Sequence, residues 1–402
     1  MSANSRKAKR LIQLPPYLFV EIDKAKRRAK EEGKPIIDLG IGDPDQGTPQ
    51  PIVDALSKAA QDSKYHHYAL DAGLPQLRRG IAGWMQQRYG VELNPQTEIL
   101  PLIGSKEGIS HLAWALLNPG DAALVPDPGY PLYANTTILA GAEPIAVPLK
   151  IENAFLPELD KIPDKAWERS PLMYLNYPNN PTGAACELGL FEEVVDRARK
   201  YGTLIAQDAA YSEMCYDGYR APSILQVPGA KETAIEFHSF SKTFNMTGWR
   251  LGWVCGNAEA LAALGQMKSN VDSGIFEVVQ LAGLEALALG ESFIEQSCVA
   301  YARRRNCLVQ GLRAQGWDAP NPKATFYVWV PVPKGLGSSA EVAKLLLDKA
   351  DLVVTPGNGF GKFGEGYIRF ALTVEETLLE KAVERLAGVE EIAQCFGERQ
   401  VG

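Results

Sequence analysis

The chain has 402 residues, of which 46% are hydrophobic and 22% charged, and its formal net charge is −7. This length suffices for two or three domains with substantial cores, and the composition is that of a globular protein rather than a disordered or fibrous one. The acidic balance excludes the basic surface with which proteins bind nucleic acid, so no nucleic acid is expected as a partner.

Cysteine and histidine usage excludes two further classes of protein. The six cysteines form no C-x-x-C pair, and we identify no signal peptide, so a disulfide framework is not expected and the cytoplasm is the default compartment. Four histidines, among them the adjacent His66 and His67, are a poor basis for a metal centre, and no metal is expected. Apolar runs stay well below the ~18 residues of a membrane span, so no membrane partner is expected either.

Short apolar runs alternate with longer helical patterns from about residue 96 onward. The pattern predicts strands over 97–103, 122–125, 172–176, 203–207, 234–239 and 251–255, and helices over 105–117 and 187–201. Gly120 and Gly202 follow these two helices closely, as is common at helix ends. Because strands and helices alternate, the fold class is predicted to be α/β, with a mostly parallel sheet covered by helices on both faces.

The pattern changes after about Gly290. We predict a helix over 292–315, a strand over 326–330, a helix over 339–350, a strand over 367–371 and a last helix from Val374. This order is typical of a smaller α+β domain. The predicted organisation is therefore a segment 1–45 that packs with the small domain, a large cofactor-binding domain 46–290 and a small C-terminal domain 291–402.

Polar residues gather at four predicted strand ends, where ligands bind in open α/β sheets. The first group, 104–108, opens a helix directly after a strand, and free backbone N–H groups there suit a phosphate. Its spacing fits neither the dinucleotide fingerprint nor the Walker motif. The second group, Asn176 to Gly183, is rich in turn residues and is by itself compatible with a tight loop.

The third and fourth groups contribute charge. Asp208 ends a strongly apolar strand, where a carboxylate is costly to bury without a cationic partner. Ser239 and Ser241 precede Lys242, and Arg250 follows eight residues later. Two hydroxyls, a lysine and an arginine can form the second half of a phosphate cup, with the lysine as nucleophile. Each group alone is compatible with a structural role, but their order and spacing fit one chemistry.

The combination of Asn180-Pro181-Thr182-Gly183, Asp208-x-x-Tyr211 and Ser239-x-Ser241-Lys242 with Arg250 resembles the class I and II aminotransferases, which are fold-type I pyridoxal-phosphate enzymes. The resemblance extends from about Tyr17 to the last helix. It implies pyridoxal 5'-phosphate as cofactor, an amino acid and a 2-oxo acid as substrates, and a homodimer with shared active sites.

The resemblance also implies a role for each cofactor residue. Lys242 would hold the cofactor as an internal Schiff base and then carry the proton at the substrate Cα, and Asp208 would pair with the protonated pyridine nitrogen. Tyr211 and Asn180 would hydrogen-bond the phenolic oxygen, and Tyr130 would stack on the ring. The phosphate would lie among Ser105, Lys106, Ser239, Ser241 and Arg250, with Tyr68 reaching it from the neighbouring subunit.

On the substrate side, Arg369 resembles the family's clamp for the α-carboxylate, a role that suits the planar fork of arginine. Gly40 would leave room beside that carboxylate, and Tyr17 would cover the site. Asn180 and Tyr68 would also face the substrate.

Residues 40–45, Tyr68-x-x-Asp71 and residues 269–276 are similar to the branch of the family that acts on LL-diaminopimelate in lysine biosynthesis. Asp71 of the neighbouring subunit would bind the distal ammonium, although better-known members carry a longer glutamate at this position. Asn270 and Asp272 are further candidates for this contact.

Several alternatives share the cofactor motifs. An aspartate or alanine aminotransferase would differ only in its substrate pocket. A carbon–sulfur lyase or a cyclopropane-carboxylate synthase of the same fold would not depend on an amino acceptor. A cofactor-sensing transcription regulator would need an attached DNA-binding domain, and the residues before Gly40 lack a basic helix-turn-helix pattern.

Overall fold

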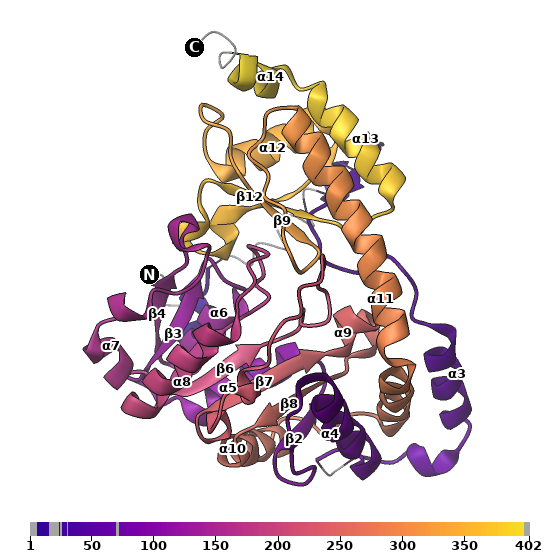
Figure 1. Cartoon of the computed structure of the whole chain (residues 1–402), viewed down its shortest axis with the longest axis vertical. Coiled ribbons are helices and arrows are strands. Elements are labelled where there is room, and N and C mark those ends of the chain that lie inside the picture. Colours follow the sequence, from indigo (N-terminus) through magenta and orange to yellow (C-terminus); the bar gives the residue numbers. More distant parts are fainter. Residues whose placement is uncertain (1–5, 16–23, 25, 30, 70–71, 398–402) are drawn as a thin grey trace.

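The computed structural model describes residues 6–15, 24, 26–29, 31–69 and 72–397. A seven-stranded sheet lies in the lower half of the molecule (Figure 1). Its strands are β2 (Ile99–Leu102), β3 (Ala122–Asp127), β4 (Glu143–Pro148), β5 (Leu172–Leu175), β6 (Leu204–Asp208), β7 (Ala234–Ser239) and β8 (Gly252–Gly256). They are ordered β2-β8-β7-β6-β5-β3-β4. Only β8 runs antiparallel to its neighbours, so the sheet is mostly parallel, as predicted.

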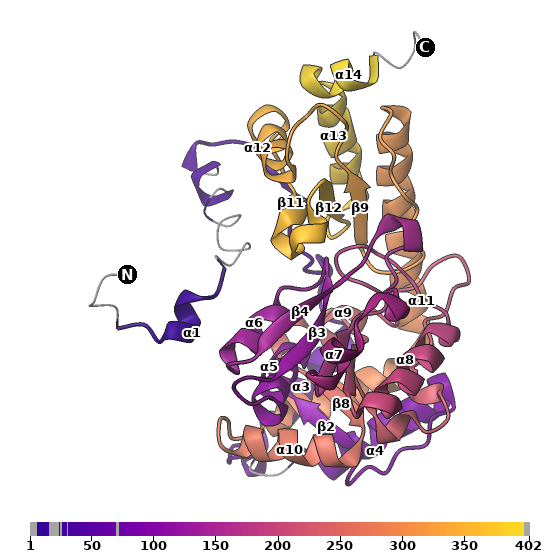
Figure 2. The same cartoon turned by 90° about the vertical axis from the view of Figure 1, so that its left-hand side faces the viewer.

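Both faces of this sheet are buried, which explains why its strands are continuously apolar. In β5, Leu172 and Tyr174 pack in one core cluster, whereas Met173 and Leu175 pack in another. The first cluster contains residues of α5 (Ser105–Leu116), α6 (Leu132–Leu139) and α10 (Ala258–Ser269), and the second those of α4 (Pro75–Tyr89), α8 (Leu188–Tyr201) and α11 (Glu277–Ala314). Figure 2 shows α5 and α6 on one side of the sheet and α8 on the other. The predicted α/β class is confirmed.

The C-terminal unit in the upper half of Figure 1 has its own core. It comprises β9 (Tyr327–Pro331), β10 (Leu352–Val353), β11 (Thr355–Pro356), β12 (Tyr367–Ala371), α12 (Ser339–Ala350), α13 (Glu376–Ala387) and α14 (Glu390–Gly397). The antiparallel sheet β11-β12-β9 packs against α12 and α13. The short strand β1 (Ile37–Asp38) pairs in parallel with β10, so residues from near the N-terminus join this unit.

Helix α11 runs from the lower region into the C-terminal unit (Figure 1). The predicted helix over 292–315 corresponds to the part of α11 that follows Gly290, whereas the part before it, from Glu277, was not predicted. Gly290 has a φ of 60° and a ψ of −144°, which interrupt the helical geometry between these two parts. Only glycine adopts such a conformation readily.

Other elements differ from the sequence prediction or were missed by it. The last predicted helix corresponds to α13, which begins at Glu376 rather than Val374. Missed entirely were β4, α4, α6, α10 and α3 (Gln50–Ala59). The remaining helices are α1 (Lys9–Ile12), α7 (Asp164–Glu168) and α9 (Phe240–Thr243). Within the described ranges, no helix combines the length and apolarity that a membrane span requires.

Candidate active site

A cavity of about 280 Å³ lies where β5, β6 and β7 end and α5 begins. Its wall brings together the predicted residues Ser105, Lys106, Tyr130, Asn180, Asp208, Tyr211, Ser239, Ser241, Lys242, Arg250 and Arg369. Their separation along the chain is large, but the carboxyl ends of parallel strands meet at one edge of the sheet. The same wall includes Gly42, Tyr133, Asn176 and Tyr327, which the sequence analysis did not assign.

One end of the cavity is a cradle for an anion. Arg250 packs so closely on Gly104 that a Cβ atom at position 104 would lie 2.3 Å from the guanidinium. Gly104 precedes the first residue of α5, where backbone N–H groups are free of helical partners. Across the cradle, the Ser239 side chain accepts a hydrogen bond from the backbone N–H of Ser241 at 3.2 Å. Backbone amides, hydroxyls and a guanidinium together suit a phosphate group.

Asp208 is a buried carboxylate at the end of β6, with 7% of its surface exposed. Its Oδ2 accepts a hydrogen bond from the Tyr133 hydroxyl at 2.7 Å, and its Oδ1 accepts one from the Ala210 amide at 3.1 Å. Burial raises the pKa of Asp208, and these two hydrogen bonds oppose the shift. Neither donor carries a positive charge, so the carboxylate suits a cationic ligand group.

Lys242 follows Ser241 in α9. Its Nζ donates a hydrogen bond to the Gly42 carbonyl at 2.8 Å and lies 5.6 Å from the centre of the Phe326 ring. Burial lowers the pKa of Lys242 to about 8; Asp43 opposes this shift, and Arg250 and Arg369 add to it. The lowered pKa increases the neutral fraction of the amine near physiological pH, and a nucleophile or general base acts in this neutral form.

Arg369, on β12, lies opposite with 1% of its surface exposed. Its Nη1 donates to Asn180 Oδ1 and its Nη2 to the Gly40 carbonyl, both at 2.7 Å. The guanidinium lies 4.0 Å from the centre of the Tyr327 ring and 4.7 Å from that of Phe360. These partners are neutral, and burial lowers the pKa of Arg369. The planar guanidinium can bind a carboxylate through two parallel hydrogen bonds.

Gly40 and Gly42 have different surroundings. Gly40, which was expected to leave room for a ligand carboxylate, contributes a carbonyl acceptor to Arg369, and a Cβ atom there would meet Val353 at 3.2 Å. Gly42 is the glycine that lines the cavity, and a Cβ atom there would lie 1.9 Å from the Tyr327 hydroxyl. The glycine-rich run was therefore a sound signal, and long-range packing decides which glycine faces the cavity.

The missed residues support the predicted ones. Tyr327 places its hydroxyl 3.1 Å from that of Tyr211. Asn176 donates to the Asp208 carbonyl at 2.7 Å and thereby joins the ends of β5 and β6. Tyr133 follows Tyr130 by three residues, and the centres of their rings lie 5.8 Å apart. Asn176 stands in the recognised turn-rich group, so its position was visible in the sequence, whereas its partner was not.

Of the predicted site residues that the structure describes, Gly40 and Tyr68 are not part of the cavity wall. Tyr17 and Asp71 lie outside the described residues. Tyr68 has 80% of its surface exposed. The further candidate Asp272 accepts hydrogen bonds from Lys268 at 3.0 Å and from the Gly274 amide at 2.8 Å, so it orders its own loop.

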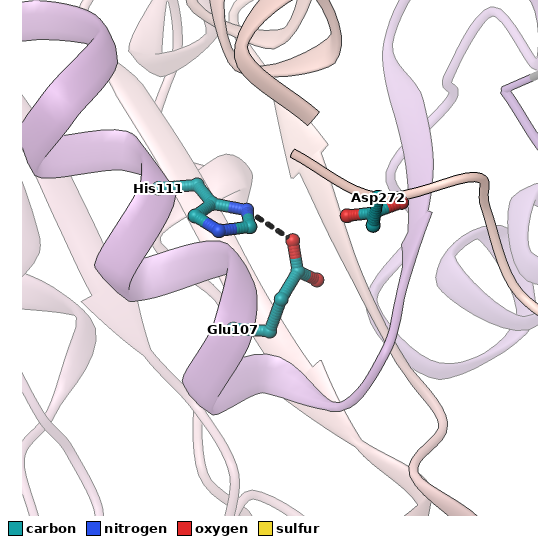
Figure 3. A group of neighbouring side chains, drawn as sticks. All are labelled: Glu107, His111 and Asp272. Atoms are coloured by element: carbon teal, nitrogen blue, oxygen red, sulfur yellow. Dashed lines mark ion pairs between the residues drawn. The ribbon is translucent and has the colours of Figure 1, made fainter. Parts of the chain in front are cut away.

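Figure 3 shows Glu107, His111 and Asp272, whose potential ligand atoms lie within 4.8 Å of one another. His111 Nδ1 is 2.5 Å from the Glu107 carboxylate. The Lys268 ammonium, however, lies 2.8 Å from Glu107 and 3.0 Å from Asp272. Both carboxylates thus pair with one buried lysine, and the group is an ion-pair network that joins α5 to the end of α10.

Comparison with known proteins gives consistent matches. The model of the family described as aminotransferase class I and II matches residues 34–386. LL-diaminopimelate aminotransferase of Moorella thermoacetica is 50% identical over 384 residues, which cover 96% of this chain and 98% of that protein. LL-diaminopimelate aminotransferase of Desulforudis audaxviator is 52% identical over 381 residues, 95% of this chain and 97% of that protein. A single mutant of Thermus thermophilus aspartate aminotransferase superposes with a TM-score of 0.90 at 29% identity, over 96% of this chain and 100% of that chain. The expected fold is confirmed.

Proposed function

We infer the function from the premise that this chain belongs to the class I and II aminotransferases. It is an enzyme that transfers an amino group between an amino acid and a 2-oxo acid. We propose LL-diaminopimelate as the amino donor and 2-oxoglutarate as the acceptor, in lysine biosynthesis. The observation that carries this choice is the identity of about half the residues with LL-diaminopimelate aminotransferases, over nearly the full length of both chains.

The residues present fit the family's cofactor, pyridoxal 5'-phosphate. The cradle beside Gly104 suits its phosphate, and the buried Asp208 carboxylate suits its protonated ring nitrogen. We propose that Ser105, Lys106, Ser239, Ser241 and Arg250 hold the phosphate, that Tyr130 stacks on the ring, that Tyr211 and Asn180 hydrogen-bond the phenolic oxygen and that Lys242 holds the carbonyl carbon. When bound, this cofactor supplies an electron sink for negative charge at the substrate Cα.

The chain's own residues then divide the work. Arg369 donates two parallel N–H bonds to the α-carboxylate and so orients Cα. The Lys242 amine, neutral in part because of its lowered pKa, removes the Cα proton and returns it. The Asp208 carboxylate keeps the ring nitrogen protonated, and the Tyr133 hydroxyl holds that carboxylate in place.

We propose a homodimer in which Tyr68 and Asp71 reach the partner's site, Tyr68 at the phosphate and Asp71 at the distal ammonium of the donor. The high exposure of Tyr68 supports a role outside its own chain. We place the enzyme in the cytoplasm, because its six cysteines are free.

A competition assay tests the donor. We expect kcat/KM for LL-diaminopimelate with 2-oxoglutarate to exceed that for aspartate or alanine by at least ~10², because unpaired distal partners penalise the shorter donors. Asp71→Ala is expected to narrow this gap by roughly 1–3 kcal/mol, and Asp71→Glu to preserve it.

The other outcomes separate the alternatives. A preference for aspartate or alanine overturns the donor assignment and leaves the aminotransferase activity standing. An intact preference in Asp71→Ala moves the distal contact elsewhere, first to residues 269–276. Product released without any 2-oxo acid indicates the lyase alternative.

A further inference from the structure

The end of β3 is tied to the C-terminal unit through backbone atoms. Asp127, the last residue of β3, accepts hydrogen bonds from the backbone N–H groups of Phe363 at 2.9 Å and Lys362 at 3.1 Å, one on each carboxylate oxygen. Two residues further on, the Gly129 amide donates to the Phe360 carbonyl at 2.9 Å. These bonds join two parts of the chain more than two hundred residues apart.

This approach depends on glycine at position 361. Gly361 has a φ of 126°, which other residues rarely adopt. A Cβ atom there would also lie 2.1 Å from Asp127 Oδ1. Gly361 is followed by the short 3₁₀ helix Lys362–Gly364, and the Asp127 carboxylate satisfies the first two of its free N–H groups. The local conformation of this loop is therefore matched to a carboxylate on β3.

Both ends of the connection reach the active site. Tyr130 directly follows Gly129 and lines the cavity. Phe360, with 3% of its surface exposed, lies 4.7 Å from the Arg369 guanidinium and packs edge-on against Trp329 at 5.8 Å. The segments that contain Tyr130 and Phe360 are thus joined by the Gly129 bond, and the Asp127 carboxylate holds the turn that follows Phe360.

The same connection borders a groove that shares a residue with the active-site cavity. A groove of about 730 Å³ is lined by Asp127, Tyr130, Phe360 and Gly361, among others. Tyr130 is shared by this groove and the cavity that contains Arg369 and Lys242. A loss of the Asp127 bonds therefore affects a loop that lies beside a residue of the active-site cavity.

We propose that Asp127 is a positioning residue for substrate binding, which fixes the loop 357–364 so that Phe360 holds Arg369 in its clamping geometry. This role rests on the proposed function of Arg369. Removal of the carboxylate leaves two backbone N–H groups without their acceptor and loosens the loop. The phosphate cradle, Asp208 and Lys242 lie on other elements and stay in place. Substrate affinity should therefore fall while cofactor affinity is preserved.

The test compares two carboxylates that accept hydrogen bonds from backbone N–H groups of the C-terminal unit. Glu365 accepts hydrogen bonds from the backbone N–H groups of Ser339 at 2.7 Å and Gly366 at 2.9 Å, all within the C-terminal unit. In the holoenzyme, Asp127→Ala should raise KM for the amino donor about tenfold, a change of the size that the loss of a hydrogen bond to a charged group causes. It should lower kcat less than about threefold. Glu365→Ala should leave KM within about twofold, even where it lowers the melting temperature. Asp127→Asn, which keeps the shape and one acceptor, should fall between wild type and Asp127→Ala.

Two further measurements do not depend on turnover. Hydrogen exchange at the Lys362 and Phe363 amides should accelerate in Asp127→Ala and not in Glu365→Ala. The affinity for 2-oxoglutarate, measured by calorimetry, should weaken about tenfold in Asp127→Ala alone, whereas the affinity for pyridoxal 5'-phosphate stays unchanged.

An equal rise in KM for both variants would show general loosening and overturn the proposal. Faster exchange without a change in KM or in 2-oxoglutarate affinity would overturn it too. If wild type transfers no amino group from any donor, the proposed function fails, and the 2-oxoglutarate affinities still decide the role of Asp127.

Discussion

The two sides of the active site are built in different ways. One side, which we call the sheet side, consists of residues at strand ends of the seven-stranded sheet and in the helices that follow these strands: Ser105, Asp208, Ser239 and Lys242. The other side, which we call the clamp side, consists of Gly40 from the N-terminal segment and Phe360 and Arg369 from the C-terminal unit. Arg369 is joined to Asn180 across 189 positions and to Gly40 across 329.

This difference has a mechanical consequence. Strand register fixes the sheet side, so its groups keep their spacing as long as the seven-stranded sheet is intact. The clamp side exists only while three distant parts of the chain meet. We therefore expect substitutions on the sheet side to change the chemical step, and those on the clamp side to change substrate affinity.

The largest expected effect is on the sheet side. Lys242→Ala should reduce amino transfer by at least ~10³, since it removes both the attachment point of the cofactor and the proton carrier. Turnover and borohydride-trapped cofactor, detected by mass spectrometry, measure the two losses. Lys344→Ala, at an exposed lysine paired with Asp348, serves as the control. Ordinary turnover with a trapped adduct in Lys242→Ala would assign the role to another lysine.

The same contrast explains what the sequence could predict. Sheet-side residues stand within short motifs directly after apolar strands, so both their identity and their meeting place could be predicted. On the clamp side the sequence offered Arg369 and Gly40, and Phe360 gave no signal. That Arg369 donates to the Gly40 carbonyl depends on packing across 329 positions, and that it faces the Phe360 ring depends on the fold of the loop between them. Gly290, by contrast, was a readable signal, because the helix predicted to follow it is the second part of α11.

The second effect concerns the charge of Lys242 in the cofactor-free chain. Its pKa is about 8 in the folded state against 10.5 for the ordinary group, so between these pH values the unfolded state binds more protons than the folded state. The free energy of unfolding should therefore rise with pH across this window, by up to about 3 kcal/mol more in wild type than in Lys242→Met. Below pH 8 the two proteins should show the same dependence on pH. Urea unfolding of both proteins from pH 7 to 10.5 measures the difference. Parallel curves would contradict the lowered pKa.

The third effect tests the clamp side. Arg369→Lys keeps the positive charge but loses the planar fork that reaches both Asn180 and Gly40. KM for the donor should rise roughly 10- to 100-fold, with a smaller change in kcat, because a charge-assisted hydrogen bond is lost. Arg303→Lys, at an exposed arginine near Glu376, should leave both constants unchanged. A fall in kcat with constant KM would instead place Arg369 in the chemical step and remove the distinction between the two sides.

The smallest expected effect tests whether the sheet side includes a residue outside the strand ends. Tyr133 belongs to α6 rather than to a strand end, yet its hydroxyl lies 2.7 Å from Asp208 Oδ2. Burial raises its pKa well above 10, so it remains a donor. Tyr133→Phe preserves the stacking on Tyr174, whose ring lies 5.1 Å away, and should lower kcat about three- to tenfold with little change in KM. Tyr174→Phe is the matched control.

A double-mutant cycle decides the route of this effect. If the Tyr133 hydroxyl acts by holding the Asp208 charge, Tyr133→Phe should cost much less in an Asp208→Asn background than in wild type. Single-turnover rates of the four proteins give the coupling. Additive losses would show that the hydroxyl acts independently of Asp208, and the sheet side would then end at the strands themselves. Coupled losses would extend the sheet side to α6. This helix begins two residues after Tyr130, close in sequence to Asp127, which accepts a hydrogen bond from the loop on the clamp side.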